Sequence, residues 1–303
     1  MEISFAGFIL AALSGLSLAL IGVAFRLGQS KNVVPLHIAT SIGICGALFF
    51  GVQMKWSLLA EIPLFIYIMA LIVALGQILA MELTKASLKR GPLSPVWCAL
   101  NLNFLVVIIY AALVYGEAVR LFQALALISG LLCVIAASNL GDEEKKDGSV
   151  VKLNDKILYA IMLILILISN SFVFLTIRDL GSRLVPGYSF SYLAKYLPNI
   201  YFILYLMMAL VCGTVVSLQK IRPESRGSLL RLGLMAGGGS IAGLFLLSMC
   251  ASYPAAFVFT VNGMITILAG TLASVFFFGE KRSKAWYLTI AFGVLAVILA
   301  NIK

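Results

Sequence analysis

The sequence is poor in charged residues. Only 11% of its 303 residues are Asp, Glu, Lys or Arg, whereas 62% are hydrophobic. A soluble domain carries about 25% charged residues, so a water-soluble fold would have nowhere to place this much apolar surface. The composition therefore excludes a soluble domain and predicts a polytopic membrane protein.

Residue types that perform catalysis or bind metals are also scarce. The chain has a single histidine, His37, with no second His and no Cys or carboxylate at ligand spacing. Its five cysteines all fall inside apolar segments without a CxxC pair, namely Cys45, Cys98, Cys133, Cys212 and Cys250. No P-loop, dinucleotide fingerprint or Ser/His/Asp signature is present. We therefore expect no disulfide, no metal site, no cofactor and no enzymatic activity, and we place His37 at the membrane interface.

What the chain has instead is a series of long apolar runs. About 20 apolar residues cross a bilayer, and ten segments satisfy that length. The sequence therefore predicts an all-α integral membrane protein with ten transmembrane helices. The expected spans are 5–26, 34–54, 62–84, 93–115, 119–140, 157–177, 189–217, 229–251, 255–277 and 284–302.

The two halves of the chain repeat each other at an offset of 163 residues. Gly116-Glu117 closes one apolar run and Gly279-Glu280 closes another, and Gly130 likewise matches Gly293. Because five helices are an odd number, the second half must lie upside down relative to the first, as in secondary transporters. The expected units are a five-helix repeat at 1–140, a charged linker at 141–156 and a second five-helix repeat at 157–303.

The distribution of basic residues predicts the orientation. Sixteen of the 22 Lys and Arg residues fall in the odd-numbered connections, and six fall on the opposite side. The side with the excess is normally cytoplasmic, so both termini are expected outside the cytoplasmic membrane. Because the basic residues sit mainly between apolar runs, we expect them to meet anionic lipid headgroups, and we expect no nucleic-acid partner.

Several short motifs occur in both halves. They are the two Gly-Glu endings, the central Gly130 and Gly293 in the helices that follow, the ends Ser138-Asn139 and Ala300-Asn301, and the bends Lys85-Ala86-Ser87 and Cys250-Ala251-Ser252. In these motifs the chain resembles the drug/metabolite transporter superfamily, specifically its ten-helix EamA-type permeases, and the likeness covers essentially the whole chain. Membership implies a central cavity formed by helices 1–4 and 6–9 and alternating access without ATP hydrolysis.

Two features depart from that resemblance. Small multidrug-type relatives carry an acidic residue in the middle of the first helix, and the segment 5–26 has none. Many ten-helix members keep both termini inside, whereas this charge pattern favours outside, as in the rhamnose-type sugar permeases. Both departures argue against a proton-coupled multidrug exporter and leave the substrate class open.

Polar residues inside the predicted spans are the candidates for substrate binding, because polar groups in hydrocarbon are costly and tend to mark pathways. At the offset of 163, Asn103 matches Thr266 and Gln77 matches Ser240; Asn262 and Thr266 are four apart on one helix face. Polar groups near mid-helix suit a small neutral or zwitterionic solute, and interhelical hydrogen bonding is the alternative. The candidates are Gln77, Asn103, Asn170, Ser240, Asn262 and Thr266.

Two charged residues are candidates for ion coupling or for pairing with a charged substrate. Glu82 lies near the end of the third span, where it either couples transport to protons or pairs with Lys85 three residues on. Lys195 precedes Pro198, which can kink the helix, and it either faces a substrate anion or snorkels to the interface. Arg26 and Arg178, equivalent at an offset of 152, are expected to snorkel or to anchor to lipid phosphates.

Together these features predict a permease that moves a small polar organic metabolite across the cytoplasmic membrane by alternating access. The alternatives are a proton-coupled multidrug or cation exporter, which requires Glu82, and a non-transporting membrane protein. The expected partners are a small-molecule substrate and membrane lipids, with a homodimer left open.

The orientation is testable with a tag fused after Lys303. We expect a membrane-impermeant reagent to reach the tag in intact cells, because the basic excess lies on the opposite side. A tag that reacts only after the cells are permeabilised would refute the predicted orientation and leave the fold untouched.

Overall fold

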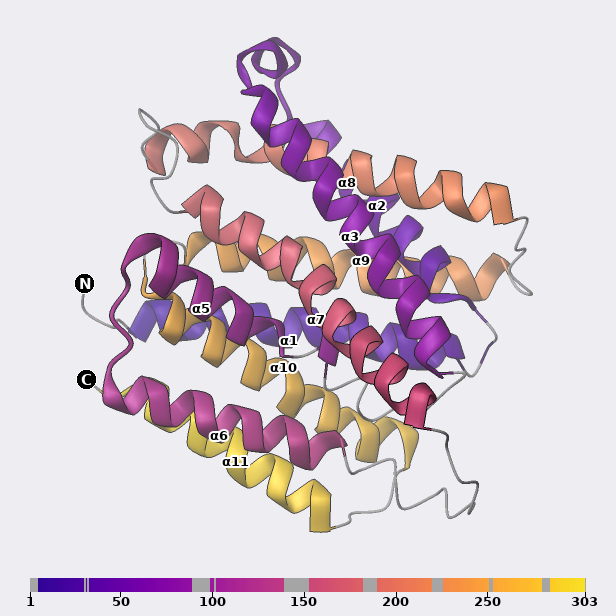
Figure 1. Ribbon diagram of the computed structural model, residues 1–303. Helices are drawn as coiled ribbons and strands as arrows, with labels where there is room; N and C mark the ends of the chain where they lie inside the picture. Colours follow the sequence, from indigo (N-terminus) through magenta and orange to yellow (C-terminus); the bar gives the residue numbers. More distant parts are fainter. Residues whose placement is uncertain are drawn as a thin grey trace.

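Figure 1 shows the computed structural model of the chain. The structure describes residues 5–29, 31, 33–88, 99–100, 102–138, 153–181, 190–219, 226–250, 253–279 and 284–302. In these ranges the regular elements are all helical, and no strand is described. The expectation of an all-α protein is therefore confirmed.

A helix lies over each apolar segment that the sequence delimits. The helices are α1 (Phe5–Gln29), α2 (Pro35–Gln53), α3 (Leu64–Leu88), α5 (Asn103–Tyr115), α6 (Leu121–Ser138), α7 (Leu153–Gly181), α8 (Phe190–Gln219), α9 (Arg226–Met249), α10 (Ala255–Phe278) and α11 (Lys284–Ala300). A short 3-10 helix, η1 (Trp56–Glu61), lies between α2 and α3 and was not expected. The linker expected at 141–156 is described only from Leu153 onward, where it already belongs to α7.

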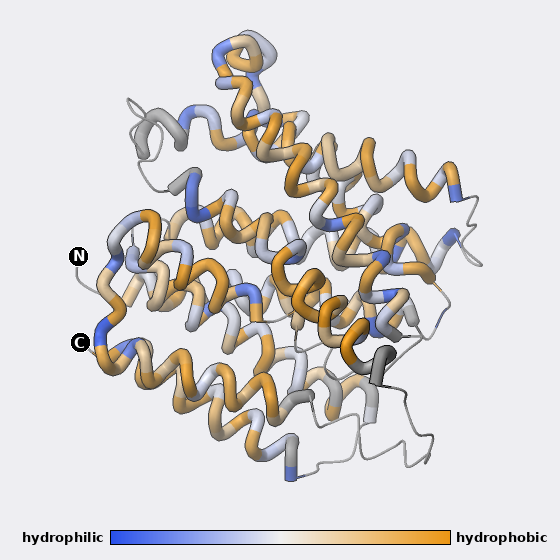
Figure 2. The backbone as a smooth tube through the Cα atoms, in the orientation of Figure 1, coloured by the Kyte–Doolittle hydropathy of each residue, from blue (hydrophilic) through white to orange (hydrophobic). Residues whose placement is uncertain are grey.

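The lengths and compositions of these helices identify a multi-pass membrane protein. Among the described residues, seven helices are long and apolar enough to cross a bilayer, and the apolar helices at 103–115, 121–136 and 286–300 are shorter. Figure 2 shows that hydrophobic residues run along the helices while hydrophilic residues gather towards their ends. Large apolar side chains such as Leu113 and Phe277 are about 80% exposed, which suits lipid rather than water.

Helices from the first and second halves of the chain pack against each other. The most extensive contacts join α2 with α8, α1 with α9 and α6 with α11. Further contacts join α1 with α10, α3 with α7, α2 with α9 and α3 with α8. In Figure 1, α6 and α11 run side by side along one edge, and both termini lie at the same end of the bundle.

Two glycines at matching positions of the two halves allow close backbone approaches at two of these crossings. A Cβ added to Gly239 on α9 would lie 2.5 Å from the backbone oxygen of Ser17 on α1. A Cβ added to Gly76 on α3 would lie 2.9 Å from the backbone oxygen of Ser169 on α7. Gly76 and Gly239 are 163 residues apart and Ser17 and Ser169 are 152 apart, so the same contact forms twice. Small residues at such crossings let helix backbones approach closely in a membrane.

The repeated Gly-Glu motif also has a conformational cause. Gly116 follows α5 with φ 64° and Gly279 follows α10 with φ 66°, and these are the positive-φ glycines in the described ranges. A left-handed residue ends a helix by turning the chain, and glycine adopts it without steric cost. Each Gly therefore stops its helix where the sequence predicted an end.

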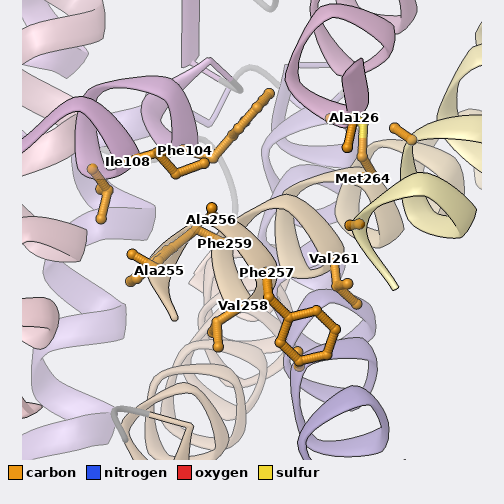
Figure 3. Packing of buried hydrophobic residues seen from close by; sticks show 14 of the residues in the cluster. Phe104, Ile108, Ala126, Ala255, Ala256, Phe257, Val258, Phe259, Val261 and Met264 are labelled. Atoms are coloured by element: carbon orange, nitrogen blue, oxygen red, sulfur yellow. The ribbon is translucent and has the colours of Figure 1, made fainter. Parts of the chain in front are cut away.

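The largest apolar core lies around α10. Phe257, Val261 and Met264 of α10 are fully buried with Phe104 of α5 and Ala126 of α6, and Figure 3 shows these side chains gathered around the α10 ribbon. This cluster positions the first turn of α5, which carries Asn103.

We expect Gly239→Ala to destabilise the protein and Gly238→Ala to serve as a matched control. The added methyl group at 239 meets the Ser17 carbonyl oxygen, whereas a Cβ at 238 has nothing within 4 Å. Overpacking a close contact costs about 1–3 kcal/mol, while replacing an exposed helical Gly by Ala is neutral or favourable. Thermal unfolding of both variants in detergent checks this, and equal unfolding temperatures would contradict it.

Candidate substrate site

The candidates on α10 bond to α1 and link it to α9. The Asn262 side-chain amide donates to Ser14 Oγ at 2.8 Å, and that hydroxyl donates to the Gly243 carbonyl on α9 at 2.7 Å. Thr266 Oγ1 donates to the Gly15 carbonyl at 3.1 Å and lies 2.8 Å from the Asn262 carbonyl. Asn262 and Ser14 are both buried. These bonds agree with interhelical hydrogen bonding, which the sequence analysis left open as the alternative to substrate binding.

Ser240 is engaged in a similar way. Its hydroxyl lies 2.9 Å from the Tyr205 hydroxyl of α8, and both residues are buried. The Tyr205 ring also covers Gly46 of α2, where an added Cβ would come within 2.2 Å of it. Ser240 therefore helps to hold α8 and α9 together.

The structure brings two of the remaining candidates together, close to the backbone that precedes Asn103. The Gln77 amide of α3 donates to Asn170 Oδ1 of α7 at 3.4 Å, and the Asn170 amide donates to the Leu100 carbonyl at 2.9 Å. Leu100 is three residues before Asn103. Side-chain amides from α3 and α7 thus meet the backbone just before α5.

A turn at Leu102 precedes α5 here, and Asn101 lies outside the described residues. Ala99 and Leu100 are helical, Leu102 forms a turn with φ −78° and ψ 0°, and α5 begins at Asn103. The prediction that Asn103 lies near the middle of a helix spanning 93–115 is therefore wrong, because Asn103 occupies the first turn of α5. The Asn170 amide bonds to the Leu100 carbonyl, which precedes this turn.

The two halves differ at equivalent positions in this region. At the offsets of 163 and 152, Asn262 and Ser14 correspond to Ala99 and Ile166. Ala99 and Ile166 are buried together in a small apolar cluster. One half therefore forms a polar contact between these helices where the other half forms an apolar one.

The charged candidates lie near the helix ends. Glu82 lies 3.9 Å from Lys85 Nζ and accepts a hydrogen bond from Gln219 at the end of α8, and the Glu82 and Lys85 side chains are 34% and 41% exposed. The i,i+3 pair expected for Glu82 is therefore formed. Lys195 Nζ lies 3.3 Å from the Tyr196 hydroxyl, which in turn bonds to Glu61 of η1.

One expectation about a single residue is wrong. Arg178 is buried rather than extended to lipid headgroups, because it pairs with Glu117 beyond the end of α5. His37 is buried near the start of α2, and its expected place at the membrane interface stays a prediction. The repeat contained the signal for the ion pair, since Glu117 and Arg178 each belong to a repeated motif, but sequence alone does not show that two motifs at different offsets meet. Glu280, the equivalent of Glu117, lies outside the described residues.

Within the ranges that the structure describes, no group of three His, Cys, Asp or Glu side chains could hold a metal ion. The region around Gln77, Asn103 and Asn170 offers neutral hydrogen-bonding amides, which donate and accept. Such groups bind polar uncharged functions and supply no nucleophile.

Comparison with solved structures supports the fold. A crystal structure described only as that of a protein superposes on this chain with a TM-score of 0.71 and 17% sequence identity, covering 96% of each chain. At this identity the similarity concerns the fold alone. No family model matches the sequence, and no curated protein matches it.

We expect Ser14 and Asn262 to be energetically coupled. Ser14→Ala and Asn262→Ala should each lower stability, and the double variant should lose less than the sum, because either substitution breaks the same bond. Coupling across membrane helices averages about 0.6 kcal/mol and reaches about 1.7 kcal/mol. Thermal unfolding of the three variants measures it; strictly additive losses would mean that the bond contributes nothing.

Proposed function

We propose that the protein is a secondary transporter that moves a small polar organic metabolite across the cytoplasmic membrane by alternating access. In this proposal it has ten membrane-spanning helices in two inverted repeats, as in the EamA-type permeases that the sequence resembles, and both termini face outward. It acts without ATP hydrolysis and without enzymatic chemistry.

The pattern of helix contacts supports an inverted repeat. In the proposed repeat, the helices α1, α2, α3, α5 and α6 correspond in order to α7, α8, α9, α10 and α11. Under this exchange the α1–α9 contact corresponds to α7–α3, α1–α10 to α7–α5, and α2–α9 to α8–α3. All of these contacts exist. The α2–α8 and α6–α11 contacts map onto themselves. The most extensive contact that lacks an equivalent among the described contacts is that between α10 and α11. Such repeats, with a midplane site between them, are typical of secondary transporters.

The turn before Asn103 is the observation that carries the proposed site. Transporters bind substrates where a spanning helix is discontinuous, because unwound backbone groups become available there. Irregular backbone at membrane depth is tolerated only inside protein or beside a water-filled path. Here Gln77 and Asn170 lie beside the turn, so the site can offer amide donors and acceptors to a neutral or zwitterionic solute.

The other sequence candidates then have a structural role. Asn262, Thr266 and Ser240 already bond to neighbouring helices. A substrate that used them would first have to break those contacts. We therefore assign binding to the side of the bundle formed by α3, α5 and α7, and we assign bundle cohesion to Asn262, Thr266 and Ser240.

The environment of Glu82 favours a metabolite carrier over the proton-coupled exporter. Its carboxylate is partly exposed near the end of α3, beside Lys85 and Gln219. A coupling carboxylate needs access from the substrate path and a protonated state at working pH. Glu82 is instead engaged by Lys85 and Gln219 at the helix end.

The experiment is a thermal-stability screen of the purified protein against polar metabolites. A ligand that binds only the folded state raises stability by about 2.7 kcal/mol at a hundredfold excess over Kd. We expect a stabilising compound whose effect is lost in Asn103→Ala and Gln77→Ala, because both remove amides from the proposed site.

Asn262→Ala is the control for that screen. It should lower the starting unfolding temperature but keep the ligand-induced shift, because Asn262 bonds to Ser14 rather than to substrate. The reverse pattern, with the shift lost in Asn262→Ala and kept in Asn103→Ala, would move the site to α10. Absence of any stabilising metabolite, together with no solute uptake into proteoliposomes, would contradict the transport function.

A further inference from the structure

An ion pair between the buried Arg178 and the partly exposed Glu117 connects three helix ends, at the end of the bundle that carries both termini (Figure 1). Glu117 follows α5, and its carboxylate pairs with the Arg178 guanidinium in the last turn of α7. The second carboxylate oxygen accepts the backbone N–H of Ala255, the first residue of α10, at 2.8 Å. One side chain of the first half thereby joins two helices of the second half.

The surroundings hold both partners in place. The Arg178 guanidinium lies 5.5 Å from the centroid of the Tyr115 ring and donates to the Tyr253 carbonyl at 3.4 Å. The Glu117 carboxylate lies at the N-terminus of α10, where the helix dipole favours negative charge. The Arg178 side chain is only 8% exposed, whereas that of Glu117 is 23% exposed.

Helix α1 closes the same end. A Cβ added to Gly7 would lie 2.9 Å from the Tyr253 ring, and Cys250 Sγ lies 3.8 Å from the Gly7 carbonyl. The first turns of α1 and α10 therefore meet the last turns of α5 and α7 around the ion pair. These are the four helices of one matched pair of contacts, because α1–α10 corresponds to α7–α5 in the proposed repeat.

We propose that the Glu117–Arg178 ion pair is a latch that closes this end of the bundle and opens during the transport cycle. The proposal rests on the proposed function, because alternating access requires the halves to separate at each end in turn. A buried ion pair seldom stabilises a protein more than apolar packing of the same volume would. An ion pair does suit a contact that must break during the cycle, because water can hydrate the two charges once they separate.

The test uses a reporter cysteine beneath the latch, in a background in which all five native cysteines are replaced by Ala. Ala11 of α1 is fully buried in the α10 core cluster, so Ala11→Cys should react slowly with a polar maleimide while the latch is closed. We expect Glu117→Gln and Arg178→Gln each to raise the labelling rate about tenfold, which corresponds to about 1.4 kcal/mol lost from the closed state.

Three controls separate opening from general loosening. Ala126→Cys, buried on α6 in the same core cluster, should stay unreactive in the latch variants. Glu82→Gln, which removes an exposed pair elsewhere, should leave Ala11→Cys slow. Exchanging the charges with Glu117→Arg and Arg178→Glu should bring labelling back towards the wild-type rate.

If Glu117→Gln and Arg178→Gln lower the unfolding temperature but leave the labelling rate of Ala11→Cys unchanged, the pair only stabilises the fold, and the proposal is overturned. Faster labelling of both reporters would overturn it too, because the whole fold would then have loosened. If Glu117→Gln does not fold, the milder Glu117→Asp should give an intermediate rate, read by the same rule. The labelling needs no substrate, so a latch that opens in a protein that moves no solute would refute the transport function separately.

Discussion

In hydrocarbon, water can neither bond to the backbone nor drive apolar helices together, so every polar group must find its partner inside the protein. This constraint explains the contacts between the halves of the chain. Gly239 and Gly76 bring helix backbones against the carbonyls of Ser17 and Ser169. Hydroxyl and amide groups such as Ser14 and Asn262 then bond across the interfaces that those glycines permit.

The same constraint separates two kinds of polar residue within the helices. Ser14, Asn262 and Ser240 form bonds that hold helices together. Asn170 instead bonds to a carbonyl beside the turn before α5, and Gln77 reaches the same place. Polar residues at positions that the predicted repeat makes equivalent therefore need not share a role, and Ala99 and Ile166 form an apolar contact at the positions that match Asn262 and Ser14.

Hydrophobic runs predicted the helices well because their length and apolar content are set by the bilayer. The positions of Gly116 and Gly279 predicted where two of them end, for the conformational reason that the structure shows. The turn before Asn103 was missed because the run 93–115 stays apolar on both sides of it. The burial of Arg178 was missed because its partner, Glu117, lies 61 residues away in the sequence.

The α6–α11 contact has a consequence for the origin of the chain. Ser129 donates to the Phe292 carbonyl at 2.9 Å, and these residues are separated by the same 163 positions as the repeated motifs. A contact between equivalent positions is what two identical chains make on the axis of a symmetric dimer. Under the proposed repeat, a half-length ancestor could have paired with an inverted copy through this helix, and gene fusion would then have needed only a linker.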